Sequence, residues 1–259
     1  MSDYAGEFLW YELMSTDPAG SEDFYKEVAG WTTEGWGEGP AAYTMWKAGD
    51  TTIGGVRQLP AEAQQGGAPS HWLAYVGTTD IGASFQKMQS LDGKVHVPPM
   101  EIPGVGKIAV FADPFGAVIA MYQPAGDAPS HGVQGPGRFS WHELYTTDLA
   151  GGIQFYETLF GWNKTSEMDM GSEHGIYHLY GKGDRNMGGM MKKPEVMPGP
   201  SAWLYYISVK DIRATLEVVT AKGGIVLNGP MEVPGGDLVA QCMDPQGAAF
   251  ALHQSGAGA

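Results

Sequence analysis

The chain has 259 residues, 43% of them hydrophobic, and a formal net charge of −14 at pH 7. This composition indicates a globular protein, and the acidic charge argues against a nucleic-acid partner, because phosphates are bound mainly by Lys and Arg. The sequence has no apolar run of membrane-spanning length and no signal-peptide pattern, so we expect a cytoplasmic protein. Its single cysteine, Cys242, excludes an internal disulfide framework.

The first half of the sequence returns in the second half. Residues 8–31 read FLWYELMSTDPAGSEDFYKEVAGW and residues 139–162 read FSWHELYTTDLAGGIQFYETLFGW. A further block, PSHWLAYVGTTD followed by DPFGAVIAMYQ, returns as PSAWLYYISVKD followed by DPQGAAFALHQ. A repeat of half the chain predicts two homologous modules, each large enough for its own core. We expect module 1 over residues 1–125, a linker over 126–136 and module 2 over 137–255.

The first block of each module predicts a strand, a helix and further strands. Asp17 followed by Pro18 is typical of a helix start, and Gly30 of a helix end. Two strands then begin at Tyr43 and Thr51, with a Gly-Asp turn between them. The same signals in module 2 are Asp148, Gly161, Tyr177 and Arg185.

The second block repeats this order after a Pro/Gly/Gln-rich connection. Residues 72–78 predict a strand, Asp80 caps a helix that we expect to end at Gly93, and three strands follow. The equivalent helix of module 2 runs from Asp211 to Gly223. Each module is therefore predicted to contain two strand-helix-strand-strand-strand units.

This order, the Asp-capped helix with Phe-Tyr and Gly-Trp, and the DPxG ending resemble the vicinal oxygen chelate superfamily. That superfamily includes glyoxalase I, bleomycin-resistance proteins and extradiol dioxygenases. The resemblance implies an α+β fold of two tandem glyoxalase-like modules. Each module would be a pair of βαβββ units whose mixed sheet forms an open cup for a ligand. Whether a cup forms within one module or by exchange between modules is left open.

The resemblance also implies a divalent metal bound by His, Gln or Glu at three strand positions of each module. The residues here, which lack oxygen and imidazole donors, are Trp10, Trp141, Leu73, Leu204, Ala120 and Ala251. We therefore predict no cofactor, with a divalent metal on a shifted set of His142, Glu143 and His253 as the alternative. His142 is favoured as a buried structural histidine. His174 and His178 are interpreted as a solvated loop pair.

Strand alternation predicts which side chains line the cups. The candidate ligand-binding residues are Trp10, Met14, Tyr75, Tyr122, Trp141, Tyr145 and Tyr206. The candidate catalytic residues are Glu12, Glu143 and His253. A carboxylate beside Trp and Tyr is partly desolvated, which raises its pKa toward the range of a general base. The alternative is a glutamate that reaches solvent or hydrogen-bonds a neighbouring strand.

These features favour a metal-free protein that binds a small aromatic or amphipathic molecule, with acid-base chemistry or sequestration as its role. Acidic charge and aromatic walls would suit a cationic ligand, as in a drug-resistance protein. The alternatives are a metal-dependent lyase, isomerase or dioxygenase, and a module kept only for partner binding. We expect a small-molecule partner, no nucleic acid or membrane, and either a monomer with internal pseudo-dimeric symmetry or a homodimer.

Overall fold

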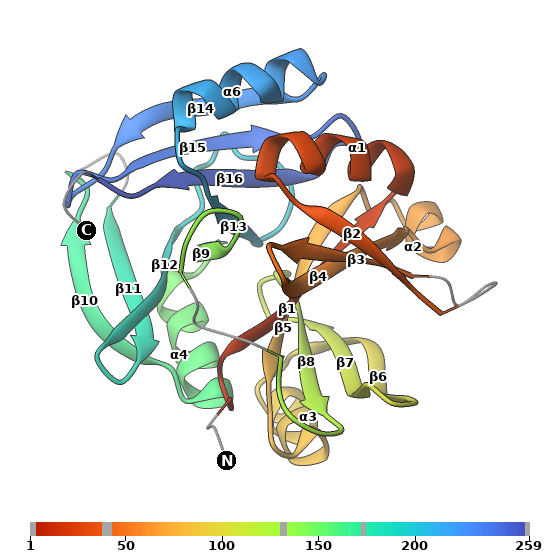
Figure 1. The fold of residues 1–259 in the computed structure, drawn as a ribbon. Coiled ribbons are helices and arrows are strands. Elements are labelled where there is room, and N and C mark those ends of the chain that lie inside the picture. Colours follow the sequence, from red (N-terminus) through yellow and green to blue (C-terminus); the bar gives the residue numbers. More distant parts are fainter. Residues whose placement is uncertain (1–3, 38–42, 130–133, 172–174, 257–259) are drawn as a thin grey trace. The chain divides into compact units, whose positions relative to one another are not determined.

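The computed structural model describes residues 4–37, 43–129, 134–171 and 175–256 (Figure 1). Module 1 contains β1 (Phe8–Ser15), α1 (Pro18–Ala29), β2 (Thr32–Trp36), β3 (Tyr43–Ala48), β4 (Thr51–Gln58), α2 (Ala61–Gln65), β5 (His71–Gly77), α3 (Ile81–Ser90), β6 (Lys94–Ile102), β7 (Gly106–Ala112) and β8 (Val118–Pro124). Module 2 contains β9 (Phe139–Thr146), α4 (Leu149–Phe160), β10 (Asn163–Asp169), β11 (Ile176–Lys182), β12 (Arg185–Lys192), β13 (Ala202–Ser208), α6 (Ile212–Ala221), β14 (Ile225–Glu232), β15 (Leu238–Met243) and β16 (Ala249–Gln254).

The strands form two eight-stranded mixed sheets, each built from the strands of one module. The orders are β2-β3-β4-β1-β5-β8-β7-β6 and β10-β11-β12-β9-β13-β16-β15-β14. The pairs β1–β4, β5–β8, β9–β12 and β13–β16 are parallel, and the hairpin-connected strands are antiparallel. The predicted α+β class and the two tandem modules are confirmed. None of the described helices is long and apolar enough to cross a membrane.

The predicted capping residues mark the start and the end of the first helix of each module. The Asp17 side chain accepts a hydrogen bond from the Gly20 amide at 3.1 Å, and Gly30 ends α1 in the left-handed conformation with φ 68°. Asp148 and Gly161 do the same for α4. Glycine suits this ending because it has no Cβ to clash at positive φ.

Two local expectations need correction. Helix α3 ends at Ser90 rather than at Gly93, because Asp92 takes the left-handed conformation with φ 62° and turns the chain. The Pro/Gly/Gln-rich connection also contains α2, a single helical turn that the composition did not indicate.

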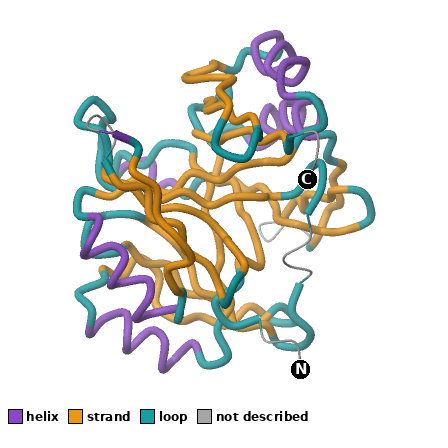
Figure 2. Tube along the Cα trace, turned by 90° about the vertical axis from the view of Figure 1, so that its left-hand side faces the viewer, coloured by secondary structure: helices purple, strands orange, loops and turns teal. Residues whose placement is uncertain are grey.

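The chain folds into two compact units that divide it differently from the repeat. Unit 1 comprises Met1–Leu9, Ala74–Gly132 and Trp141–Leu204, and unit 2 comprises Trp10–Leu73, Val133–Ser140 and Tyr205–Ala259. Each unit thus combines one half of module 1 with one half of module 2. In unit 1 α3 contacts α4, and in unit 2 α1 contacts α6. Figure 2 shows that strands make up more of the trace than helices do.

The DPxG motif joins the two sequence modules within each unit. In unit 1, Asp113 of module 1 accepts hydrogen bonds from the amides of its own turn and, at 3.1 Å, from the hydroxyl of Tyr156 in module 2. In unit 2, Asp244 and Tyr25 repeat the arrangement at 3.2 Å. The Phe-Tyr and DPxG marks of the sequence are therefore partners in the packing of the core.

Candidate functional site

A hydrogen-bonded cluster of Trp, Tyr and Glu lies in unit 1. The hydroxyl of Tyr177 donates to Oε1 of Glu143 at 2.8 Å, and Nε1 of Trp141 donates to the Tyr177 oxygen at 2.8 Å. Glu143 is only 6% exposed, whereas Trp141 is partly exposed. The indole of Trp141 therefore lies nearer the surface than the carboxylate that Tyr177 holds.

Unit 2 contains the same cluster, built from the equivalent residues of module 1. Nε1 of Trp10 donates to the hydroxyl of Tyr43 at 3.0 Å, and Tyr43 is hydrogen-bonded to Glu12. Glu12 is 5% exposed. We refer to these two groups as the Trp-Tyr-Glu clusters.

Glycines on the intervening strands allow each tyrosine to reach its glutamate. Tyr43 lies on β3 and Glu12 on β1, with β4 between them, and Gly55 of β4 is in register with Glu12. A Cβ atom on Gly55 would lie 2.3 Å from the Tyr43 ring, so only glycine leaves room for that ring. Tyr177 crosses β12 over Gly189 in the same way, and a Cβ atom on Gly189 would lie 2.1 Å from its ring.

Both tyrosines keep their protons. Burial raises the pKa of Tyr177 well above its usual range, and the negative charge of Glu143 raises it further. Burial and the negative charge of Glu12 likewise raise the pKa of Tyr43, against the smaller opposing effects of the Trp10 hydrogen bond and the Arg57 charge. Each tyrosine therefore remains a hydrogen-bond donor and fixes the orientation of a buried carboxylate, which can accept a proton or a hydrogen bond.

The other residues that were predicted to line the cups lie on strands β1, β5, β8, β9 and β13. Met14 is partly exposed on β1, and Tyr145 is buried on β9. Tyr75 is in register with Ala120, and Tyr206 with Ala251. The final predicted residue, Tyr122, is buried and donates its hydroxyl hydrogen to the Val105 carbonyl oxygen at 3.1 Å.

His253 has two polar partners that the sequence did not indicate. Its Nδ1 lies 2.9 Å from the Ser140 hydroxyl, and its Nε2 lies 2.9 Å from Oδ2 of Asp237.

His142 is held as a neutral structural side chain. Its ring stacks on Phe8 with centroids 3.7 Å apart, and Nδ1 donates to the Met187 carbonyl oxygen at 2.7 Å. Burial lowers the pKa of His142 to about 3. Because neighbouring strand residues point to opposite faces, His142 does not share a ligand position with Glu143.

The loop interpretation of His178 is wrong, since this residue lies within β11 and is 5% exposed. Its predicted companion, His174, lies outside the described residues.

The strand positions that would hold the family's divalent metal carry no donor groups. Leu73, Leu204, Ala120 and Ala251 are buried apolar residues, and the indoles of Trp10 and Trp141 donate their N–H groups to tyrosines. Among the described residues, no group of three or more His, Cys, Asp or Glu side chains could hold a metal ion. The residues present therefore do not fit that metal.

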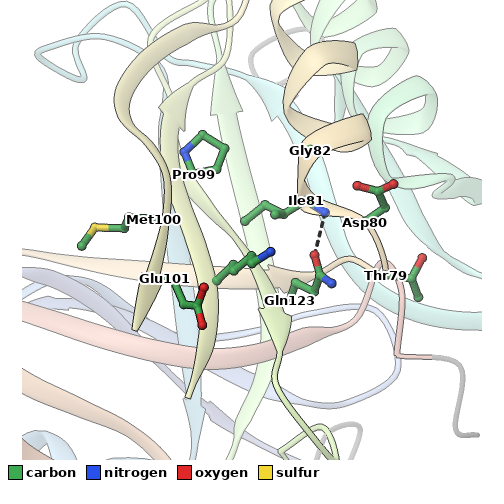
Figure 3. A pocket seen from close by; sticks show the side chains of 9 residues that line it. Thr79, Asp80, Ile81, Gly82, Pro99, Met100, Glu101 and Gln123 are labelled. Carbon is green, nitrogen blue, oxygen red and sulfur yellow. Dashed lines mark hydrogen bonds between the residues drawn. The ribbon is translucent and has the colours of Figure 1, made fainter. Parts of the chain in front are cut away.

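A surface pocket of about 640 Å³ lies elsewhere in unit 1 (Figure 3). The start of α3 and strands β6 to β8 line it, and its one drawn hydrogen bond runs from the Ile81 amide to Gln123 at 2.9 Å. Its charged residues have both signs, Asp80 and Glu101 against Lys107. It contains no residue of a Trp-Tyr-Glu cluster.

The sequence analysis missed four residues of the clusters, namely Tyr43, Tyr177, Gly55 and Gly189. Their signal was the repeat itself, since a tyrosine opens the third predicted strand and a Gly-Gly pair interrupts the fourth in both modules. A glycine within a strand often marks the close approach of another group. Applied to both copies, that rule would have indicated these positions.

Comparisons with known proteins agree with this architecture. A family model described as Glyoxalase/Bleomycin resistance protein/Dioxygenase superfamily matches residues 7–121 and 138–252. The chain is 31% identical over 252 residues to "Putative glyoxylase CFP32" of Mycobacterium bovis, covering 94% of this chain and 92% of that protein. It is 28% identical over 258 residues to "Anthracycline biosynthesis protein DauV" of Streptomyces sp. (strain C5), covering 95% and 92%.

The fold is also similar to that of a solved structure, the Mn(II)-bound glyoxalase from Novosphingobium aromaticivorans. The TM-score is 0.67 with 14% sequence identity, and the match covers 97% of this chain and 82% of that one. At this identity the similarity concerns the fold alone.

Proposed function

The chain belongs to the glyoxalase/bleomycin resistance protein/dioxygenase superfamily, and from that premise we propose a metal-independent function in binding a small aromatic molecule. In this proposal the Trp-Tyr-Glu clusters contact the ligand, and Glu12 and Glu143 act as proton acceptors. The ligand is a planar aromatic or amphipathic compound that carries a donor group or a positive charge.

The observation that carries the proposal is that the same cluster is built twice, around two buried carboxylates. Burying a carboxylate costs free energy, and each of these glutamates is oriented by a tyrosine that stays protonated. An indole beside such a carboxylate offers an apolar face and an anionic hydrogen-bond acceptor together. This combination suits an aromatic ring bearing an N–H, O–H or cationic group.

Metal independence is supported by the chemistry of the donor positions. The six positions at which the family would supply ligands hold indole, isobutyl and methyl side chains. These groups offer neither oxygen nor imidazole nitrogen to a divalent cation. A carboxylate acting as a general base needs no metal, provided that its proton donor lies within hydrogen-bond reach.

The relatives guide the choice of ligand. DauV is named for anthracycline biosynthesis, and anthracyclines are planar aromatic compounds. The formal net charge of −14 favours the approach of a cationic member of this class. An aminated anthracycline is therefore a suitable first probe.

The test is a titration of the purified protein with this probe, in which binding is measured by tryptophan fluorescence and by equilibrium dialysis. We expect saturable binding that the double variant Glu12→Gln/Glu143→Gln weakens at least about tenfold, because each substitution removes a charged acceptor. The matched control is Glu195→Gln, which removes an exposed carboxylate and should leave binding unchanged. Equal affinity in the double variant and the control would contradict the role of the clusters.

Two further measurements separate the alternatives. Elemental analysis and a titration in the presence of a chelator test metal independence, and a stoichiometric metal whose removal abolishes binding would overturn it. Hydrogen–deuterium exchange at the acidic positions of the bound probe tests proton transfer. Exchange that the double variant no longer accelerates supports a base, and binding with no acceleration assigns sequestration instead.

A further inference from the structure

A serine, a histidine and an aspartate form a continuous hydrogen-bonded series in unit 2. Ser140 lies on β9, His253 on β16, and Asp237 directly before β15. The Ser140 hydroxyl is 2.9 Å from Nδ1 of His253, and Nε2 of His253 is 2.9 Å from Oδ2 of Asp237. A nucleophile beside a base, with a third group orienting that base, is the geometry of an activated hydroxyl.

The bonds of Asp237 determine where the protons lie. Its Oδ1 accepts a hydrogen bond from the Gly256 amide at 2.8 Å. Partial burial acts to raise the pKa of Asp237, but the bonds from Gly256 and His253 outweigh it and lower that pKa. The carboxylate is therefore ionised and accepts a hydrogen bond from Nε2 of His253. In the neutral form of the imidazole, a proton on Nε2 leaves Nδ1 as an acceptor.

The Ser140 hydroxyl then directs its hydrogen to that acceptor. Its other contact is the Tyr206 carbonyl oxygen at 3.4 Å, a much longer distance than the 2.9 Å to Nδ1. With the hydrogen directed to Nδ1, the lone pairs of Oγ are available to an incoming electrophile.

The three side chains are partly exposed to solvent. The side chain of His253 is 16% exposed and that of Asp237 is 32% exposed, and Ser140 is partly exposed. This differs from the buried serines of the core, such as Ser21, which is fully buried.

The equivalent positions of module 1 do not carry this series. The repeat places Leu9, Tyr122 and Gly106 of module 1 at the positions of Ser140, His253 and Asp237. Module 1 nevertheless forms the same strands without these polar groups. Formation of the sheet therefore does not account for the series in module 2.

We propose that Ser140 is a nucleophile that accepts an acyl group from a small activated ester, with His253 as its base and Asp237 as the residue that orients His253. Oγ of Ser140 forms a bond to the acyl carbon while its proton moves to Nδ1 of His253. That proton passes to the departing oxygen, which leaves as an alcohol when the ester bond breaks. Water then attacks the acyl-serine, releases the carboxylic acid and restores the hydroxyl.

The experiment incubates the full-length protein with p-nitrophenyl acetate and measures nitrophenolate release, intact mass and the modified peptide. We expect one acetyl group on Ser140. Ser140→Ala should abolish this label, and His253→Gln should slow acylation at least about 100-fold, the range of general-base catalysis. The matched control, Ser166→Ala, removes an exposed serine on β10 and should acylate at the rate of the natural sequence.

Absence of acylation in the natural sequence, acetyl groups mapped elsewhere, or an equal rate in His253→Gln would overturn the proposal. Circular dichroism checks that each variant is folded. If Ser140→Ala does not fold, Ser140→Cys replaces it, and the rate at which iodoacetamide alkylates the introduced thiol is measured with and without His253→Gln. An alkylation rate that does not depend on His253 also overturns the activated-hydroxyl assignment.

Discussion

Replacing Tyr177 by Phe removes one hydroxyl group and two hydrogen bonds. The bond from that hydroxyl to Glu143 has a charged acceptor and contributes about 1.5–3 kcal/mol, and the bond from Trp141 contributes about 0.5–1.5 kcal/mol. The ring itself still fits over Gly189. We therefore expect Tyr177→Phe to lower the free energy of unfolding by about 3 kcal/mol, which corresponds to a fall in Tm of roughly 6–12 °C.

The measurement is urea unfolding of Tyr177→Phe, Glu143→Gln and the double variant. In this double-mutant cycle we expect a coupling energy between Tyr177 and Glu143 of at least about 1.5 kcal/mol, because the two side chains are in direct contact. The control is Tyr122→Phe, which removes a single neutral hydrogen bond to the Val105 carbonyl oxygen and should cost only about 1 kcal/mol.

Two results would refute this reasoning. One is a Tyr177→Phe variant that is no less stable than Tyr122→Phe. The other is a coupling energy below about 0.5 kcal/mol, which is the usual value for residues that do not interact. Either result would mean that the tyrosine does not hold the carboxylate in place.

Three further predictions concern other buried groups. The pKa of His142 is about 3 in the folded protein against about 6.5 unfolded, so up to about 4–5 kcal/mol of stability is present above pH 6.5 and lost as the pH falls toward 3. Between pH 7 and pH 4, urea unfolding should show a smaller loss of unfolding free energy for His142→Tyr than for the natural sequence. Equal losses would contradict the low pKa of His142. Gly55→Ala should lower the free energy of unfolding by about 2–4 kcal/mol, because the new Cβ atom displaces Tyr43. The control Gly35→Ala, whose Cβ atom meets nothing within 4 Å, should lower it far less. Similar unfolding midpoints for the two variants would count against the placement of the Tyr43 ring over Gly55. Burial raises the pKa of Cys242 to about 12, so iodoacetamide should modify it only after unfolding, as mass spectrometry would show, and rapid labelling of the native protein would disprove its burial.

Local signals in the sequence predicted most of the fold. The repeat identified two modules, Asp17 and Gly30 marked the limits of α1, and strand alternation placed Trp10 and Glu12 on one face. The helix and strand signals act over a few residues, through side-chain caps, positive φ angles and the two-residue period of a strand. They are therefore visible in a single sequence without knowledge of distant partners.

The candidate sites depended on partners that are distant in the sequence. Tyr43 reaches Glu12 because β4 lies between their strands and carries Gly55 at the crossing point, which is a consequence of sheet order and register. Sequence alternation assigns a face to each residue but does not say which strands are neighbours.

The sequence by itself determined the duplication and the limits of α1 and α4, because each is marked by residue types at fixed positions along the chain. Only the tertiary structure joined Asp113 to Tyr156 of the other module and placed Ser140 beside His253, more than a hundred residues away. These contacts arise when strands and turns from separate halves of the chain pack in one compact unit. A local pattern in the sequence does not show which distant residues become partners in such packing.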